Sequence, residues 1–521
     1  MKQIPVVDLI VVILYLLAMI GIGVYFSRKN KDADQFTKAS GKIPGWALGI
    51  SIYATFLSSN TFLGVPGKAY GTNWNAFVFS LSMPLAAWVA AKYFVPFYRK
   101  MAGVSAYSHL EQRFGGWARA YAVICFLLTQ FARMGSIFFG MALSLQAFLG
   151  FSMSSIIIVM GICIIIYTVL GGMEAVIWTE VLQGILMTFG ALLILYLVLK
   201  EVPGGVGAVY ETGVENHKFS LGSFDLDFTK STFWVILLYG FFINLNNFGM
   251  DQNYVQRYHA ASSAKEAEKS VWLCVYLYVP ISLLFFVIGT SLFAYYHANP
   301  HLTEGIRQMA AAERLGVSAT AEQINILAAS LQPADYGDKV MPHFMVHKIP
   351  KVLLGLVIAA ILSAGMSTIS SGMNASATVF IKDIYNRYIN KNNAGKIELT
   401  SLHIATAAFG IIGVTTGLAM LGIKSVLDVW WELSGIFAGG MLGLFLLGLI
   451  SKKTTGGQAA IAVVAGVVVI LWMTFSSKIP PEYAYLRSVL HINLVIVVGT
   501  LTIFFVGVGL TWLNKKRTSQ A

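Results

Sequence analysis

The sequence predicts an all-α protein that crosses a lipid bilayer about thirteen times. Hydrophobic residues make up 57% of the 521-residue chain, charged residues only 12%, and the mean hydropathy is +0.70. The apolar residues fall in repeated runs of about 20, the length that an α-helix needs to span the hydrocarbon core. These runs lie at 6–26, 44–64, 74–97, 119–149, 154–172, 175–199, 231–250, 271–296, 351–380, 400–421, 428–450, 457–476 and 489–513.

Basic residues indicate how the spans are oriented, because lysine and arginine gather in cytoplasmic loops. Here they follow the first, third, ninth, eleventh and thirteenth runs. They are Arg28, Lys29, Lys31, Lys38, Lys42, Arg99, Lys100, Arg113, Arg119, Lys382, Arg387, Lys391, Lys396, Lys452, Lys453, Lys515, Lys516 and Arg517. We therefore expect the N-terminus outside and the C-terminus in the cytoplasm, in an inner membrane of bacterial type. Topology explains most of the net charge of +12, so no nucleic-acid partner is expected.

Polar residues interrupt two of the predicted spans. In the second span, Ser58, Ser59, Asn60 and Thr61 break the apolar run midway, and in the seventh the polar stretch is 244–252. Paired breaks in corresponding halves are typical of transporters built from inverted repeats, where unwound backbone leaves carbonyl groups free to coordinate a cation. The alternative is that these side chains hold neighbouring helices together.

A polar stripe also runs along one face of the ninth predicted span. At 100° per residue its members share that face. They are Ser363, Ser367, Ser370, Ser371 and Asn374. Lipid offers these groups no hydrogen-bond partner, so the stripe must meet protein, water or an ion.

Other classes of membrane protein have less support. A channel needs a continuous polar pore or a charged ring, whereas these interruptions are local. The sequence contains neither a His-Glu-x-x-His nor a Gly-x-Ser-x-Gly pattern, and Cys125, Cys163 and Cys274 lack metal-ligand spacing, so an enzyme is not expected. A membrane sensor is a further alternative.

Several motifs, taken in their order and spacing, carry a family resemblance. They are Asp34-Gln35-Phe36, Gly45-Trp46, residues 54–61, Pro66-Gly67-Lys68-Ala69-Tyr70, Gly171-Gly172, Trp178-Thr179-Glu180, Gln256-Arg257, residues 363–371 and residues 439–453. Over nearly its whole length the chain resembles the sodium/solute symporter family, whose members carry sugars, sialic acids, proline, vitamins and iodide. The resemblance implies a sodium-coupled symporter that works by alternating access, and we expect it to function as a monomer.

The resemblance also implies a ten-helix core of two inverted five-helix repeats with two discontinuous helices. Four regions are expected: an extra helix and cytoplasmic loop at 1–43, the first repeat at 44–199, the second at 200–450, and two helices with a basic tail at 451–521. Within the second repeat, residues 297–350 are expected to form an outer loop. This loop is either a lid over an outer vestibule or a packed ornament.

Carried over position by position, the resemblance implies a main sodium site. Its ligands would be the backbone carbonyls of Ala54, Leu57 and Ala364 and the hydroxyls of Ser367 and Thr368. A second sodium site, found in some members, would use Ser370, Ser371 and Glu180, where many relatives have aspartate. Glu180 is alternatively a charge at the cytoplasmic edge near Arg257.

Arg133 is the main indication of the substrate, because it lies inside an apolar span and cannot lose its charge. Its partner is either a substrate carboxylate or a fixed group such as Glu180 or backbone carbonyls. The position resembles the arginine with which sialic-acid carriers bind their substrate. By resemblance the other pocket residues are Ser58, Thr61, Ser80, Asn244 and Asn247. Phe56 and Ser80 differ from the sialic-acid carriers, so a neutral sugar or another carboxylate remains an alternative cargo.

Overall fold

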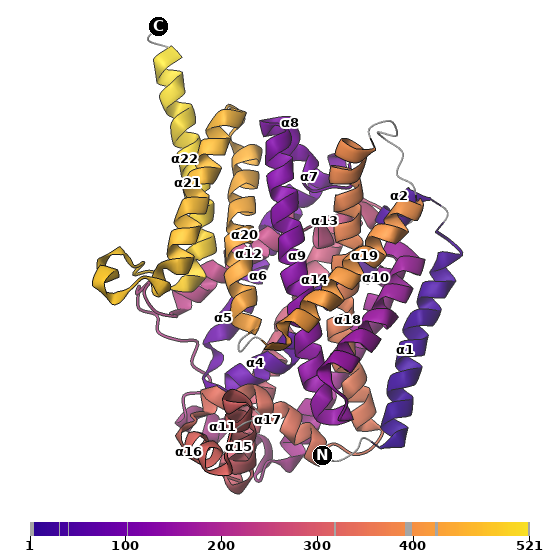
Figure 1. Ribbon diagram of the computed structural model, residues 1–521, viewed down its shortest axis with the longest axis vertical. Helices are drawn as coiled ribbons and strands as arrows, with labels where there is room; N and C mark the ends of the chain where they lie inside the picture. Colours follow the sequence, from indigo (N-terminus) through magenta and orange to yellow (C-terminus); the bar gives the residue numbers. More distant parts are fainter. Residues whose placement is uncertain are drawn as a thin grey trace.

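The computed structural model describes residues 5–518 apart from 31, 40, 102, 317–318, 391–398 and 423–425. Lys31, Lys391 and Lys396 of the basic loops lie outside the described residues, as do the side chains of Lys515, Lys516 and Arg517. Throughout the described ranges the regular elements are helices, which confirms the predicted all-α class. In Figure 1 long helices stand side by side, with α1 (Val6–Ser27) at one edge and α21 (Gly456–Phe475) and α22 (Val495–Thr518) at the other.

The predicted spans correspond to helices in the structure. Ten of the described helices are long and apolar enough to cross a membrane, and the bent pair α3 (Gly45–Phe56) and α4 (Ser59–Gly71) adds an eleventh span. Dividing α10 (Met153–Glu201) in two and adding α20 (Val426–Ile450) recovers the thirteen predicted. The division falls at Gly172, whose φ of 56° favours glycine and where a Cβ would lie 2.7 Å from the Phe36 ring.

The other described helices comprise further spans and the shorter helices that lie within or between the spans. They are α2 (Ala33–Lys38), α5 (Val78–Leu81), α6 (Met83–Val89), α7 (Val95–Lys100), α8 (Ser108–Phe114), α9 (Gly116–Leu149), α11 (Gly205–Glu215), α12 (Phe233–Met250), α13 (Gln252–Ala260), α14 (Ala264–Ala298), α15 (His301–Leu315), α16 (Ala321–Ser330), α17 (Pro333–Lys348), α18 (Leu353–Val379) and α19 (Leu399–Ala419). Short 3₁₀ or π turns lie at Trp74–Phe77, Ala90–Phe94, Phe380–Ile389, Met420–Gly422, Ser476–Lys478, Pro481–Leu486 and Ile492–Leu494.

The first discontinuous helix is the pair α3 and α4, which meet at a 60° bend. Leu57 leaves the helical conformation (φ −84°, ψ 112°), and Ser58 starts α4 as its N-cap. The Ser58 and Thr61 side chains form a reciprocal capping box, so the hydroxyls that interrupt the apolar run begin a new helix. The last carbonyls of α3 are thereby released from helical hydrogen bonding.

The second discontinuity separates α12 from α13 at Asp251 (φ −76°, ψ 117°). Its side chain caps α13 by accepting a hydrogen bond from the Asn253 amide at 2.9 Å. The sequence placed the interruption across the whole of 244–252, and this was too broad. Asn244, Asn246 and Asn247 are helical residues of α12, because a polar side chain does not by itself unwind a helix whose backbone bonds are intact.

Helix α18 lies at the centre of the molecule. In its most apolar stretch 89% of the residues are buried, against 28% for the peripheral α1. The polar stripe therefore faces protein along its whole length. Ser363 and Asn374 join neighbouring segments: the Ser363 hydroxyl bonds Tyr15 of α1 at 2.9 Å, and the Asn374 side-chain oxygen accepts from Gln256 at 2.9 Å.

Residues 297–350 fold into the three helices α15, α16 and α17, which lie with α11 at one end of the molecule (Figure 1). Helix α17 rests directly on α4. A Cβ on Gly337 would lie 2.3 Å from the Gly67 carbonyl oxygen, so two glycines permit this approach. The residues expected to form an outer loop are thus a helical layer in contact with α4 of the discontinuous helix.

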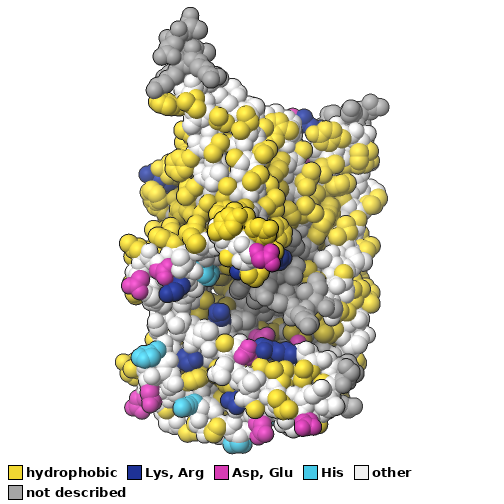
Figure 2. Space-filling view, turned by 60° about the vertical axis from the view of Figure 1, so that its left-hand side comes forward, with side chains coloured by type: hydrophobic (Ala, Val, Ile, Leu, Met, Phe, Trp, Pro, Cys, Tyr) yellow, Lys and Arg dark blue, Asp and Glu magenta, His cyan; other side chains and the backbone are white. Residues whose placement is uncertain are grey.

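The surface has the character of a membrane protein. Figure 2 shows hydrophobic side chains over a broad band, with charged and histidine side chains concentrated toward the end that carries α15 and α16. Large apolar side chains such as Ile461 and Val464 of α21 and Phe505 of α22 are exposed. A band of this kind matches the hydrocarbon region of a bilayer.

Candidate functional site

A cradle of five oxygen atoms forms where the end of α3 meets the middle of α18. The Ser367 hydroxyl lies 2.9 Å from the Ala54 carbonyl oxygen and 3.3 Å from that of Ala364. The Thr368 hydroxyl lies 3.3 Å from the Ala364 carbonyl oxygen and 3.5 Å from that of Leu57. The structure therefore brings together all five residues that the resemblance implies for the main sodium site.

Three of the four contacts are longer than an ordinary hydrogen bond. O–H···O bonds are about 2.5–3.0 Å long, so the 2.9 Å contact between Ser367 and the Ala54 carbonyl is a hydrogen bond and the other three exceed that range. Oxygens at right angles around an ion of about 2.4 Å bond length, typical of Ca²⁺ and close to that of the similarly sized Na⁺, lie about 3.4 Å apart. Three of the four measured separations are 3.3–3.5 Å. Carbonyl and hydroxyl oxygens are also the ligands that hard cations prefer.

Arg133 of α9 contacts the end of α3 beside the cradle. Its Nη2 donates to the Thr55 carbonyl at 3.2 Å, and its Nη1 lies 3.5 Å from Oδ2 of Asp251. Of the fixed partners that the sequence allowed, a backbone carbonyl is present, whereas Glu180 is bound to a different arginine. The counter-ion is Asp251, which the sequence showed as part of an interruption and not as a partner of Arg133. A carboxylate beside an intramembrane break is a signal that could have found it.

The other residues expected in the pocket contact groups on neighbouring helices or in their own turn. Ser58 and Thr61 bond each other in the cap of α4. Ser80 shares a 2.6 Å hydrogen bond with Ser282 of α14. On α12, Asn244 donates to Ser82 at 3.2 Å while its side-chain oxygen is buried without a partner, and Asn247 is partly buried.

Aromatic rings close around Phe56 at the end of α3. Its ring centroid lies 4.6 Å from that of Tyr254 and 5.5 Å from those of Phe248 and Tyr278. The sequence did not predict this cluster, since its members come from α3, α12, α13 and α14. Phe56 directly precedes Leu57, so its ring cluster lies next to the Leu57 carbonyl of the oxygen cradle.

Glu180 lies beside Arg257, as the alternative expected, but both side chains are buried in a polar network and neither reaches the surface. Its side chain is 0% exposed and that of Arg257 is 1% exposed, with Nη2 of Arg257 2.6 Å from Oε2. Ser51 and Ser371 donate hydrogen bonds to the same carboxylate. Ser370 points elsewhere and donates to the Ser367 carbonyl at 3.1 Å. The three residues expected for a second sodium site are therefore only partly brought together.

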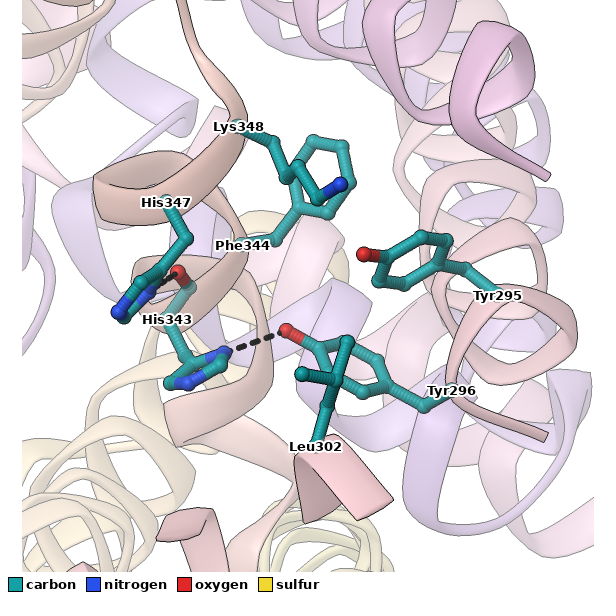
Figure 3. Close-up of a pocket in the computed structure, with 7 residues that line it drawn as sticks. All are labelled: Tyr295, Tyr296, Leu302, His343, Phe344, His347 and Lys348. Atoms are coloured by element: carbon teal, nitrogen blue, oxygen red, sulfur yellow. Dashed lines mark hydrogen bonds between the residues drawn. The ribbon is translucent and has the colours of Figure 1, made fainter. Parts of the chain in front are cut away.

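A separate cavity of about 290 Å³ lies between the C-terminal end of α14 and helices α15 and α17 (Figure 3). The Tyr296 hydroxyl and Nδ1 of His343 are 2.7 Å apart, and the His343 and His347 rings lie with centroids 4.3 Å apart and their planes tilted by 33°. Burial lowers the pKa of His343 to about 4. In the described part of the chain, no group of three or more His, Cys, Asp or Glu side chains could hold a metal ion.

The sequence model of the sodium:solute symporter family matches residues 36–466, which is most of the chain. The chain belongs to the sodium:solute symporter family. The chain is 33% identical to the sodium/sialic acid symporter NanT of Aliivibrio fischeri, over 94% of this chain and 91% of that protein. It is 26% identical to the sodium/glucose cotransporter of Vibrio parahaemolyticus, over 95% and 90% of the two chains.

A solved structure of another family member shares the fold. The substrate-bound, outward-open Na⁺-coupled sialic acid symporter superposes with a TM-score of 0.82, at 30% identity, covering 97% of this chain and 98% of that one. As a sodium:solute symporter, the chain is a multi-pass membrane transporter that moves a small solute with sodium and is not an enzyme. The resemblance drawn from the motifs is confirmed.

Proposed function

We propose that this symporter imports an acidic sugar such as sialic acid together with sodium by alternating access. The observation that carries the proposal is Arg133, a guanidinium on a membrane-spanning helix whose nearest acid is 3.5 Å away, longer than a tight ion pair. A substrate carboxylate could pair with this guanidinium bidentately. The similarity to two sodium/sialic acid symporters supports the same cargo.

The oxygen cradle of Ala54, Leu57, Ala364, Ser367 and Thr368 is the proposed sodium site. Sodium there would join the unwound end of α3 to α18 and hold the discontinuous helix in the form that binds solute. Arg133 donates to the carbonyl of Thr55, the residue after Ala54. One peptide unit therefore lies between the proposed sodium ligand and the proposed carboxylate partner, so each binding event can reinforce the other.

The proposed arrangement in the membrane follows from the same elements. Residues 44–199 and 200–450 form the two inverted repeats, with 1–43 and 451–521 outside them. The N-terminus faces outside and the C-terminus the cytoplasm of a bacterial-type inner membrane, since basic loops favour the cytoplasm. The two termini lie at opposite ends in Figure 1, which supports an odd number of spans. We expect one chain to suffice for transport.

A neutral sugar is the second candidate cargo, and the position of Asp251 beside Arg133 supports it. Because this carboxylate already faces Arg133, the pair is formally neutral and an uncharged solute needs no counter-ion. Ser80 of α5 and Asn244 of α12 are buried polar residues whose hydroxyl and amide groups suit hydroxylated solutes. The two cargoes differ in one requirement, which is whether the charge of Arg133 is needed.

Uptake into proteoliposomes separates these possibilities. The purified full chain is reconstituted, and labelled sialic acid and glucose are supplied with an inward sodium gradient, with equal sodium on both sides, and with potassium instead. Sodium-driven uptake of sialic acid that excess unlabelled glucose does not inhibit supports the acidic cargo. Glucose uptake without sialic acid uptake supports the second candidate, and uptake indifferent to sodium refutes the coupling.

A further inference from the structure

We propose that the guanidinium of Arg257 takes the place of a second sodium ion, so that one sodium accompanies each solute molecule. This inference rests on the proposed sodium-coupled function and specifies its stoichiometry. Glu180, Ser370 and Ser371 are the residues around which a second sodium was expected. In the structure the positive charge among them belongs to the protein.

Arg257 binds the oxygens that a second cation would need. Its Nη2 lies 2.6 Å from Oε2 of Glu180, 2.6 Å from the Ser371 hydroxyl and 2.9 Å from the Thr55 hydroxyl. Its Nε donates to the Ser51 hydroxyl at 2.8 Å. Arg257 thus satisfies acceptors from α3, α10 and α18 at once, as a bound cation would.

The charges in this network already balance. Glu180 and Arg257 are buried together, and a buried ion pair is tolerated because each charge compensates the other. A sodium ion entering beside Glu180 would leave two cations and one carboxylate out of contact with water. Asp251, the other nearby acid, faces Arg133 and is not available to compensate the extra charge.

The two candidate cation positions differ in a second way. In the cradle of α3 and α18 the Ser367 and Thr368 hydroxyls contact the carbonyls of Ala54, Leu57 and Ala364. Arg133 donates to the adjacent Thr55 carbonyl, and among the described residues no arginine binds these two hydroxyls. Around Glu180, by contrast, Ser370 points toward the Ser367 carbonyl, and Ser371 is bonded to both members of the ion pair. The oxygen set is assembled for an ion at the first position and around a guanidinium at the second.

The stoichiometry determines what drives transport. One sodium carried with a monoanionic sugar moves no net charge, so the membrane potential would not contribute and only the sodium gradient would concentrate the solute. Two sodium ions would make the same cycle electrogenic. An arginine in place of the second sodium therefore predicts electroneutral uptake of sialic acid.

Equilibrium binding of ²²Na⁺ to the purified full-length protein tests the proposal without requiring transport. At pH 8.5 the wild type is expected to bind one sodium per chain, and Ser367→Ala is expected to weaken that binding at least 10-fold. Arg257→Gln leaves Glu180 without its cation and is expected to bind two sodium ions per chain. The double variant Arg257→Gln/Glu180→Gln removes both charges and is expected to bind one again, which also shows that a chain without Arg257 folds.

The outcomes separate this inference from the function on which it rests. Two sodium ions bound to the wild type, or one bound to Arg257→Gln, would overturn the role of Arg257 and leave sodium coupling intact. No sodium bound to the wild type would refute the coupling itself. In proteoliposomes, sialic acid uptake should be unchanged when a potassium and valinomycin potential is imposed, and stimulation by an inside-negative potential would contradict one-to-one coupling.

Discussion

Arg133 of α9 and Asp251 of the break between α12 and α13 face each other with 3.5 Å between Nη1 and Oδ2. The pair joins a long continuous helix to the point at which a discontinuous helix unwinds. It places a resident acid where the carboxylate of an acidic substrate would be expected to bind. The acid and the substrate would therefore compete for one guanidinium.

Replacing Arg133 should abolish uptake of an acidic sugar. Removing one partner of a buried charge pair costs about 2–5 kcal/mol, or roughly 30-fold to several-thousand-fold in affinity. Arg133→Ala should therefore raise the KM for sialic acid by at least about 30-fold, and Arg133→Lys should recover only part of the loss because lysine cannot bind bidentately. Measured initial uptake rates that match the wild type would exclude a carboxylate clamp.

Neutralising Asp251 should have the opposite effect on the same measurement. Asp251→Asn removes the resident competitor, so the KM for sialic acid should fall by roughly 10-fold, equivalent to about 1.4 kcal/mol. The unpaired Arg133 should also lower the thermal stability of the solute-free protein. Uptake of a neutral sugar, if present, serves as the control and should keep its KM. A rise in the KM for sialic acid would show that Asp251 supports binding instead of competing.

Removing one ligand of the cradle should weaken sodium binding. A hydrogen-bond-like contact to a charged group contributes about 1.5–3 kcal/mol, so Ser367→Ala should raise the sodium concentration for half-maximal uptake by roughly 10- to 100-fold. Ser363→Ala is the matched control, because its hydroxyl lies one turn before Ser367 on α18 and bonds Tyr15 instead of a cradle carbonyl. If Ser363→Ala alters sodium dependence and Ser367→Ala does not, the sodium site lies elsewhere.

The contact between α17 and α4 should be sensitive to a single methyl group. A Cβ on Gly337 would lie 2.3 Å from a backbone oxygen of Gly67, so Gly337→Ala should destabilise the protein by about 1–3 kcal/mol through overpacking. A Cβ on Gly305 of α15 would have nothing within 4 Å, and Gly305→Ala should be neutral or stabilising. Thermal unfolding of the two purified variants measures the difference, and equal melting temperatures would show that the helices readjust.

The packing of α17 should lose stability in acid because of His343. Burial lowers the pKa of its imidazole to about 4, whereas an unfolded histidine has a pKa near 6.5. Between these values the unfolded chain binds more protons than the folded one, so the stability falls as the pH drops from about 6.5 to 4. His343→Gln removes this group and should flatten the dependence of melting temperature on pH in that window. An unchanged profile would assign the acid sensitivity to other groups.

Much of the fold could be predicted from the sequence because its causes are local or repetitive. The spans follow from runs of apolar residues, and the bend at Ser58 follows from hydroxyls that favour a new N-cap. The polar stripe of α18 is visible from helical periodicity alone. These signals act within a few residues, so they can be detected along the chain. The sequence located the second break less precisely, because polar side chains do not reveal at which residue the backbone leaves the helical conformation. In the structure that residue is Asp251.

The sequence by itself determined that the protein is helical, spans a membrane, is interrupted twice and has an oxygen-rich face on α18. Only the tertiary structure decided which charges meet. Arg133 lies 118 positions from Asp251, and Arg257 lies 77 positions from Glu180. Pairing across such distances leaves no local pattern, because it depends on how four helices pack. The physical reason is desolvation: a buried guanidinium must find a carboxylate, and the packing alone determines which one lies within reach.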